Sequence, residues 1–272
     1  MMRHSAPKKI RSVHNLLRSP LFELFQLLML FSAIFWLFAT GSRNLNYNWQ
    51  WYQIPQYLVI PSAKGLSAGP LLQGLLITLQ ISAISLMVSL LIGLITAVFR
   101  LSASPVAGLL ARLYIEIIRN TPLLIQLFFI YFVLGPLLGL DRLPAAILSL
   151  SLFEGAYIAE IFRSGILSVA REQYEAAYSL GLSPYATYRH VILPQAIRTV
   201  LPPLTSQAIS LIKDSALVST IAIYDLTMQA QSIIAETFLT FEVWLTVAVL
   251  YLIITIALSY LAGVLEHRLK LP

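Results

Sequence analysis

The chain has 272 residues, of which 58% are hydrophobic and only 11% are charged. A soluble domain carries charge on about a quarter of its residues, so this composition excludes an ordinary cytosolic enzyme and a disordered protein. Despite the net charge of +6, it also excludes a nucleic-acid-binding protein. The absence of cysteine excludes disulfides, iron–sulfur clusters and thiol catalysis.

Six apolar runs predict membrane-spanning helices, because such a helix needs about 20 predominantly apolar residues. The first run follows a basic segment at 1–20, exceeds the core of a signal peptide and lacks an Ala-x-Ala site, so we expect a retained helix. The helix of the third run is expected to begin further back, near Pro105. The fifth run is the least regular, because it holds prolines and charges. The runs span 21–40, 65–99 (with an apolar centre at 71–99), 120–140, 143–165, 199–224 and 243–265.

The basic residues indicate how the spans are oriented, since Lys and Arg favour cytoplasmic segments. With the N-terminus inside, the outside segments hold only Arg43, Lys64 and Arg142. The inside segments hold Arg3, Lys8, Lys9, Arg11, Arg18, Arg100, Arg171, Arg189, Arg198, Arg268 and Lys270. This bias predicts that both termini are cytoplasmic, which requires an even number of spans.

The outside connection between the first two spans, 41–70, is rich in aromatic residues. Amphipathic rings gather at the headgroup level of a membrane, so we favour an interfacial belt. A docking surface for an external partner is the alternative. The residues concerned are Tyr47, Trp49, Trp51, Tyr52 and Tyr57.

The long inside loop, 168–198, has the pattern of two short helices. A first helix is predicted over 172–180, and Gly181 suits its C-terminal end. Ser183 followed by Pro184 is typical of the start of a second helix, which we expect to end before Pro194. Composition alone favours a solvated hairpin that has no partner.

The same loop carries a resemblance to a known family. Glu175-Ala176-Ala177, then Gly181, then Leu193-Pro194, resembles the EAA loop of ABC importer permeases, although Val191 and Glu172 replace the usual Ile and Gly. Three further stretches resemble the polar amino-acid permeases within that family, with Asn120 at a position that is usually Gly. They are 119–129 (RNTPLLIQLFF), 155–166 (GAYIAEIFRSGI) and 213–219 (KDSALVS).

The resemblance implies an all-α, polytopic membrane protein with about six transmembrane helices and a core like that of the type I ABC importer permeases. The core would occupy 71–265, preceded by an extra helix at 21–40 and the periplasmic connection 41–70, and followed by a cytoplasmic tail at 266–272. It also implies that the loop 168–198 couples a separate ATPase to the spans. The coupling residues would be Glu175, Ala176, Ala177, Gly181, Leu193 and Pro194.

A permease of this kind is a transport subunit and not an enzyme. The chain has no Gly-x4-Gly-Lys-Ser/Thr, so it cannot form the loop that binds the phosphates of ATP. We therefore expect no cofactor on this chain, and ATP is used by the partner ATPase. The resemblance implies a multi-pass protein of the bacterial inner membrane. Its partners would be ABC ATPase subunits, a second permease (identical or a sister), a periplasmic solute-binding protein, membrane lipid and a polar amino acid, but no nucleic acid.

Charges inside apolar spans are costly, and they usually face a cavity or one another. Glu160 and Arg163 are three residues apart and could simply pair, as Glu116 could with Arg112 or Arg119. These pairs give each charge a purely structural explanation.

Some intramembrane charges are also candidates for binding a substrate. Glu154 has no basic residue within one turn, and Lys213 and Asp214 lie in the proline-containing fifth run, where a broken helix could line the path. An amino acid needs an anion for its ammonium group, and a cation or a helix N-terminus for its carboxylate. We therefore expect Glu154, Glu160, Lys213 and Asp214 to line the substrate path.

Two other classes of protein are less consistent with the sequence. A secondary amino-acid transporter driven by an ion gradient would leave the EAA pattern unexplained, and no internal repeat is evident. An integral membrane enzyme would need a catalytic motif, but the chain contains neither His-Glu-x-x-His nor Gly-x-Ser-x-Gly.

Overall fold

The computed structural model describes residues 20–44, 47–62 and 65–269, which divide into two compact units between residues 50 and 51. In the first unit, helix α2 (Pro20–Asn44) contains the predicted span 21–40. Its stretch 22–41 is long and apolar enough to cross a membrane. Glu23 lies in the first turn, where a carboxylate interacts favourably with the helix dipole. The predicted basic segment 1–20 lies outside the described residues, apart from Pro20.

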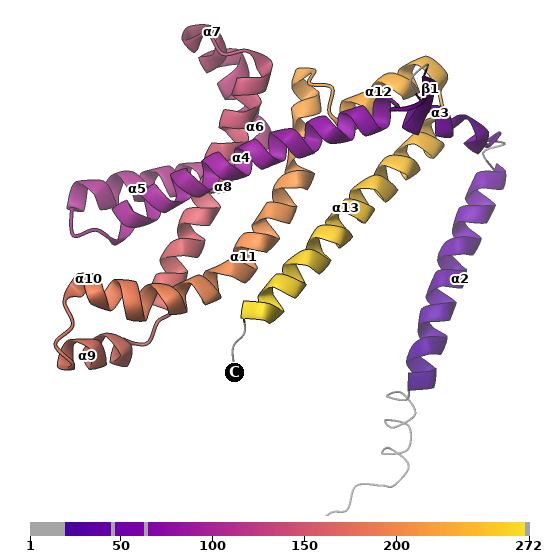
Figure 1. Cartoon of the computed structure of the whole chain (residues 1–272). Helices are drawn as coiled ribbons and strands as arrows, with labels where there is room; N and C mark the ends of the chain where they lie inside the picture. Colours follow the sequence, from indigo (N-terminus) through magenta and orange to yellow (C-terminus); the bar gives the residue numbers. More distant parts are fainter. Residues whose placement is uncertain (1–19, 45–46, 63–64, 270–272) are drawn as a thin grey trace, which may run out of the picture. The chain divides into compact units, whose positions relative to one another are not determined.

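The second unit is a bundle of helices joined by short connections (Figure 1). Its long helices follow the apolar runs, because a helix satisfies its backbone hydrogen bonds within one segment. The elements are η1 (Trp51–Gln53), α3 (Pro55–Leu58), β1 (Val59–Ser62), β2 (Gly65–Ala68), α4 (Pro70–Leu101), α5 (Pro105–Arg119), α6 (Leu123–Phe128), η2 (Phe129–Leu134), α7 (Gly135–Leu138), α8 (Arg142–Leu167), α9 (Arg171–Ser179), α10 (Pro184–Thr187), η3 (Tyr188–Ile192), α11 (Leu193–Asp214), η4 (Ser215–Ile221), α12 (Leu226–Thr237) and α13 (Thr240–Leu269).

Helices α4 and α8 form the centre of this unit, and they pack against each other more extensively than any other pair. Small residues let their backbones approach closely. A Cβ atom at Gly93 would lie 2.5 Å from Cγ2 of Ile158, and one at Gly155 would lie 2.8 Å from Cγ2 of Ile92. Helix α11 packs against the same two helices, so these three elements fix the geometry of any site between them.

The third predicted span is a broken helix, and the expectation of one continuous helix from near Pro105 is wrong. Helix α5 begins at Pro105 but ends at Arg119, and the segment α6–α7 continues at an angle of 107° to it. Pro122 accounts for the break: it has no N–H to donate, and it disfavours the helical conformation of Thr121 before it.

By length and composition, four of the described helices could cross a membrane, or five if the bent pair counts as one span. The four lie in α2, α4, α8 and α13. The sequence predicted about six spans, and the run missing from the structural count is 199–224. This run forms most of α11 together with η4, and its charges and paired prolines make it less apolar than the others.

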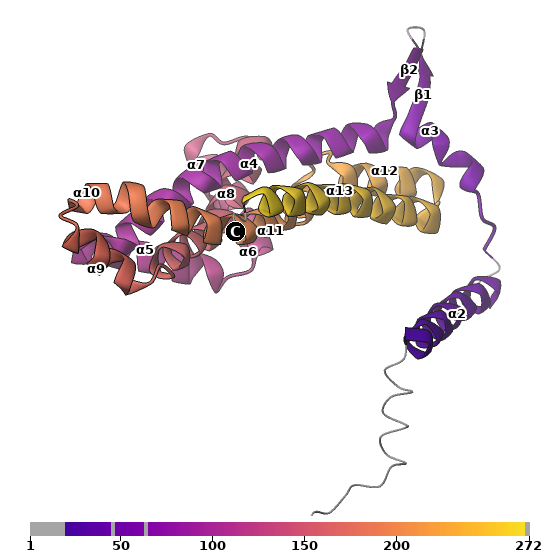
Figure 2. The same ribbon diagram turned by 60° about the horizontal axis from the view of Figure 1, so that its bottom comes forward.

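A small antiparallel hairpin, which was not predicted, interrupts the otherwise helical unit. Strands β1 and β2 pair with Val59 opposite Ala68, and with α3 they lie beside the start of α4 (Figure 2). The preceding Ile54 is buried in a cluster that includes Leu71 and Leu226. Much of the connection 41–70 is therefore a folded element, and its role as an interfacial belt stays a prediction.

The two hairpins of the unit lie at opposite ends. Helices α9 and α10 are far from the strands β1 and β2 in both views (Figures 1 and 2). Helix α11 runs from the α9–α10 end back into the bundle, where it packs against α8, α4 and α13.

Candidate functional site

The loop 168–198 forms a compact helical hairpin whose turn follows the predicted chemistry. Helix α9 begins one residue earlier than predicted, at Arg171. Gly181 has a φ of +77°, a conformation that L side chains rarely adopt. Its N–H donates to the carbonyl of Tyr178 (2.9 Å), and the N–H of Leu182 donates to that of Ala177 (3.1 Å). These two bonds satisfy carbonyls at the helix end and fix a sharp turn.

The second helix of the hairpin does not end before Pro194, as predicted, but continues into α11. Ser183 caps its start by accepting a hydrogen bond from the N–H of Ala186 (3.3 Å). A π-helical turn, η3, then leads directly into α11, with Pro194 in its first turn. Proline lacks a donor and clashes with the carbonyl four residues before it, and the wider π turn accommodates both effects. The hairpin and α11 thus form one helical body.

Five of the six predicted coupling residues are exposed: Glu175, Ala176, Gly181, Leu193 and Pro194. The sixth residue, Ala177, is buried. Oε1 of Glu175 accepts a hydrogen bond from Nε of Arg171 (3.0 Å), but both side chains are largely exposed to solvent. Such a pair contributes little to stability, so this carboxylate is available to a partner.

An apolar cluster anchors the hairpin on the bundle. Val169, Ile192 and Ala196 are buried together, and Tyr174 of α9 packs against them. Burial raises the pKa of the Tyr174 hydroxyl, so this group stays neutral. Because the cluster joins the end of α8, helix α9 and the start of α11, the hairpin is attached rigidly to the bundle.

A groove of about 520 Å³ opens between the end of α5, helix α8 and helix α11. We call it the charged groove, because polar and charged side chains make up most of its wall. It combines groups that could hold both ends of a zwitterion. The residues that line it are Arg119, Tyr157, Glu160, Ile161, Ser164, Pro203, Ser206 and Gln207.

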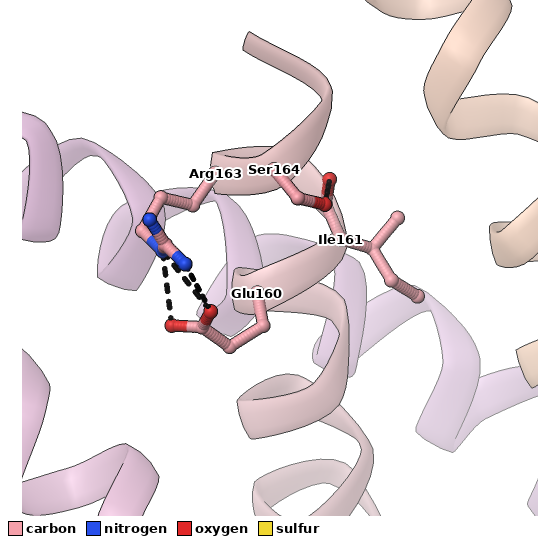
Figure 3. A network of polar contacts seen from close by, with 4 residues as sticks. All are labelled: Glu160, Ile161, Arg163 and Ser164. Carbon is pink, nitrogen blue, oxygen red and sulfur yellow. Dashed lines mark hydrogen bonds and ion pairs between the residues drawn. The ribbon is translucent and has the colours of Figure 1, made fainter. Parts of the chain in front are cut away.

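Glu160 and Arg163 are paired, as the sequence allowed. The guanidinium of Arg163 donates from Nε to both carboxylate oxygens and from Nη2 to Oε2, the last at 2.8 Å (Figure 3). The two side chains are 23% and 30% exposed, so the pair is partly desolvated and stronger than a surface ion pair. Glu160 therefore lines the charged groove with its charge already balanced.

Glu154 is fully buried six residues, or about 1.7 helical turns, before Glu160. Its Oε2 accepts a hydrogen bond of 2.6 Å from Nε2 of Gln207 on α11. Its Oε1 has no hydrogen-bond partner among the described residues. The carboxyl group thus lies behind the groove wall, linked to the groove through the amide of Gln207.

The other two candidate residues of the substrate path do not line the charged groove. Lys213 and Asp214 end α11, about two turns beyond Gln207, and neither lines the charged groove. Lys213 is exposed and makes no ion pair within the described residues. Glu160 thus lines the groove and Glu154 reaches it through Gln207, while Asp214 lies close enough to Glu154 to interact with it electrostatically.

The pairing that the sequence allowed between Glu116 and a neighbouring arginine does not form among the described residues. Oε2 of Glu116 accepts a hydrogen bond from Nδ2 of Asn120 (3.0 Å), and the described residues hold no ion pair between Glu116 and either Arg112 or Arg119. The guanidinium of Arg119 instead lies over the ring of Tyr157, with its Cζ 5.1 Å from the ring centroid. Helix spacing alone does not show that an aromatic ring from another helix competes for this arginine.

Sequence reasoning missed Gln207 and Gln126, two uncharged side chains that hold the site together. Both are polar residues within predicted spans, and that is the signal that could have found them. Nε2 of Gln126 donates to the carbonyls of Ile118 (2.8 Å) and Thr121 (3.1 Å). These carbonyls lie on both sides of Arg119, at the break before Pro122, so this amide fixes the position of Arg119.

Replacing Gln126 with Leu is expected to lower stability by about 1–3 kcal/mol, because two partly buried carbonyls lose a donor. The thermal unfolding midpoint of the purified protein in detergent measures the effect. Gln231→Leu, an exposed position on α12, is the matched control. Equal midpoints for the two variants would show that Gln126 does not hold the break.

Comparisons with known proteins show to which family the chain belongs. A family model described as "Binding-protein-dependent transport system inner membrane component" matches residues 89–271. The "Glutamine transport system permease protein GlnP" of Escherichia coli (strain K12) is 44% identical over 204 residues, which cover 74% of this chain and 93% of that protein.

Solved structures support the same grouping. One described as an amino acid ABC transporter with histidines is 38% identical, with a TM-score of 0.70, and the match covers 73% of this chain and 94% of that one. An inward-facing MetNI methionine ABC transporter is 23% identical with a TM-score of 0.65, over 74% of this chain and 97% of that one, and it supports the fold alone. The all-α permease fold predicted from the sequence is thereby confirmed. The chain belongs to the family of inner membrane components of binding-protein-dependent transport systems, which are the multi-pass permease subunits of ABC importers.

Proposed function

We propose that the protein carries a polar amino acid across the bacterial cytoplasmic membrane as the permease subunit of an ABC importer. The observation that carries this proposal is the continuity of the exposed hairpin with α11, which lines the charged groove with Pro203 and Gln207. The names of the relatives support the substrate class, since one is a glutamine permease and another belongs to an amino acid transporter.

In this proposal an ATPase subunit binds the hairpin through Glu175 and the turn at Gly181. A separate ATPase is needed because the chain has no phosphate-binding loop of its own. Motion of the ATPase would shift the hairpin and α11 as one body and so open the charged groove to one side of the membrane and then to the other. A second permease, identical or a sister, would complete the path, and lipid would cover the outer faces.

The proposed orientation places the hairpin and both termini in the cytoplasm. The position of basic residues supports it, and so does the separation of the two hairpins at opposite ends of the unit (Figure 1). The β1–β2 hairpin would then face the periplasm, where a solute-binding protein delivers the amino acid.

The proposal is tested by reconstituting the permease with its ATPase and its binding protein in liposomes. Uptake of labelled L-glutamine should require ATP and the binding protein. Uptake driven by an ion gradient without ATP would instead favour a secondary transporter.

Replacing Glu154 with Gln is expected to slow uptake about tenfold, because an amide replaces the carboxyl group that accepts a hydrogen bond from Gln207 in the groove wall. Glu160→Gln should also slow uptake, since it leaves the guanidinium of Arg163 without its partner. Initial rates in the reconstituted system measure both. Glu236→Gln, exposed at the end of α12, is the control. Unchanged kinetics in the two groove variants would remove Glu154 and Glu160 from the substrate path.

A further inference from the structure

The charged groove contains a cation, Arg119, that forms no direct ion pair with a described carboxylate. The guanidinium of Arg119 lines the groove, and no ion-pair partner lies within 4 Å among the residues that the structure describes. Two acids of α8 and α5 have other hydrogen-bond partners: Glu160 binds Arg163 through three hydrogen bonds, and Glu116 accepts from Asn120. Arg119 is exposed in the last turn of α5 and lines the groove, so an anion that enters the groove can reach its guanidinium.

The orientation of Arg119 is fixed by its surroundings. The ring of Tyr157 covers one face of the guanidinium at 5.1 Å, an arrangement that is attractive and leaves the N–H groups at the edge available. The backbone on both sides of Arg119 is held by the amide of Gln126. A planar group that is held in this way matches a carboxylate, which accepts two parallel hydrogen bonds from it.

The rest of the groove offers neutral polar groups rather than free acids. The nitrogen of the Gln207 amide is used by Glu154, which leaves its oxygen able to accept from an ammonium group. Ser164 and Ser206 add hydroxyl groups to the wall. The described groove thus contains no unpaired carboxylate that could hold a cationic side chain.

We propose that Arg119, stacked on Tyr157, binds the α-carboxylate of the transported amino acid, and that the groove disfavours amino acids with a cationic side chain. This inference rests on the proposed function and assigns a specificity-determining residue within it. The broken helix α5–α6 places the arginine at the groove, since it ends α5 directly before the bend.

The test uses the purified permease–ATPase complex in nanodiscs without a binding protein, so that only the permease selects the ligand. Binding of labelled L-glutamine is measured in competition with unlabelled L-glutamine, L-glutaminamide and L-arginine. In the wild type, glutaminamide and arginine should each compete at least about tenfold more weakly than glutamine, since one lacks the carboxylate and the other adds a cation.

In Arg119→Gln, the preference for glutamine over glutaminamide should fall to about one. Arg119→Lys should keep part of it, because lysine keeps the charge but not the planar fork. The control is Arg112→Gln, an exposed position on the same helix that does not line the groove, and it should keep the full preference.

Three results would overturn the inference, and they are distinguishable. An Arg119→Gln complex that still prefers glutamine over glutaminamide as the wild type does would overturn the role of Arg119 alone. A wild-type complex that takes up no amino acid with ATP and any binding protein would overturn the proposed function as well. Equal competition by glutaminamide and glutamine in the wild type would exclude a carboxylate site in the groove.

Discussion

Glu175→Lys is expected to reduce ATP-driven uptake by more than about tenfold while the protein still inserts into the membrane. The side chain of Glu175 is 64% exposed, so reversal of its charge leaves the fold of the hairpin intact. Within α9 the new lysine would face Arg171, which costs only about 0.2–0.5 kcal/mol. The large loss would come from a contact with the ATPase, and uptake together with the amount of inserted protein measures it.

A charge swap shows whether this loss comes from the contact with the ATPase or from the pair with Arg171. In Arg171→Glu combined with Glu175→Arg, the pair within α9 is restored in reverse. If the pair itself mattered, the double variant would transport like the wild type. Low uptake by the double variant would place the effect in the partner, and normal uptake by Glu175→Lys would contradict the coupling role.

Variants of Gly181 provide a second test of the contact with the ATPase. Its φ of +77° is accessible to Asn and Asp, and a Cβ atom there would meet nothing within 4 Å. Gly181→Asn and Gly181→Asp therefore differ mainly in charge. We expect Asp to reduce uptake more strongly than Asn, and equal uptake by the two variants would show that no acidic or basic partner approaches the turn.

Gly165→Ala should destabilise the bundle by about 1–3 kcal/mol or more. A Cβ atom at this position of α8 would clash with Cγ2 of Val200 on α11. Val200 is buried and β-branched, so it has little freedom to turn away. The thermal unfolding midpoint in detergent measures the effect.

Two further variants control this result. Gly108→Ala makes the same change in α5, where a Cβ atom meets nothing within 4 Å, and a gain of up to about 1 kcal/mol in helix propensity is expected. Val200→Ala should restore stability in the presence of Gly165→Ala, because it removes the clashing methyl group. Equal stability of Gly165→Ala and Gly108→Ala would mean that α8 and α11 are further apart than the structure places them.

The sequence predicted best those features that depend on neighbouring residues. Uninterrupted apolar runs predicted α4 and α13, and the caps at Gly181 and Ser183 predicted the turn of the hairpin. Spacing of three residues predicted the Glu160–Arg163 pair, since such residues share one face of a helix.

Features that depend on distant residues could not be predicted in this way. Gln207 binds Glu154 across 53 positions of sequence, and Arg119 stacks on Tyr157 from another helix. Both contacts are set by how α5, α8 and α11 pack, which a single sequence does not reveal. Pro122 could have predicted the break before it, but the charge-free run 120–140 indicated one continuous helix.

Helix α11 has a mechanical consequence, because it reaches from the hairpin to the far side of the charged groove as one element. Its 22 residues extend about 33 Å at 1.5 Å per residue. A tilt of only about 10° at Leu193 would move the Asp214 end by about 6 Å, roughly one helical turn. The helix would therefore act as a lever that converts a small rotation outside the bundle into a displacement as large as an amino-acid side chain. Pro202 and Pro203 are the points at which this lever can bend.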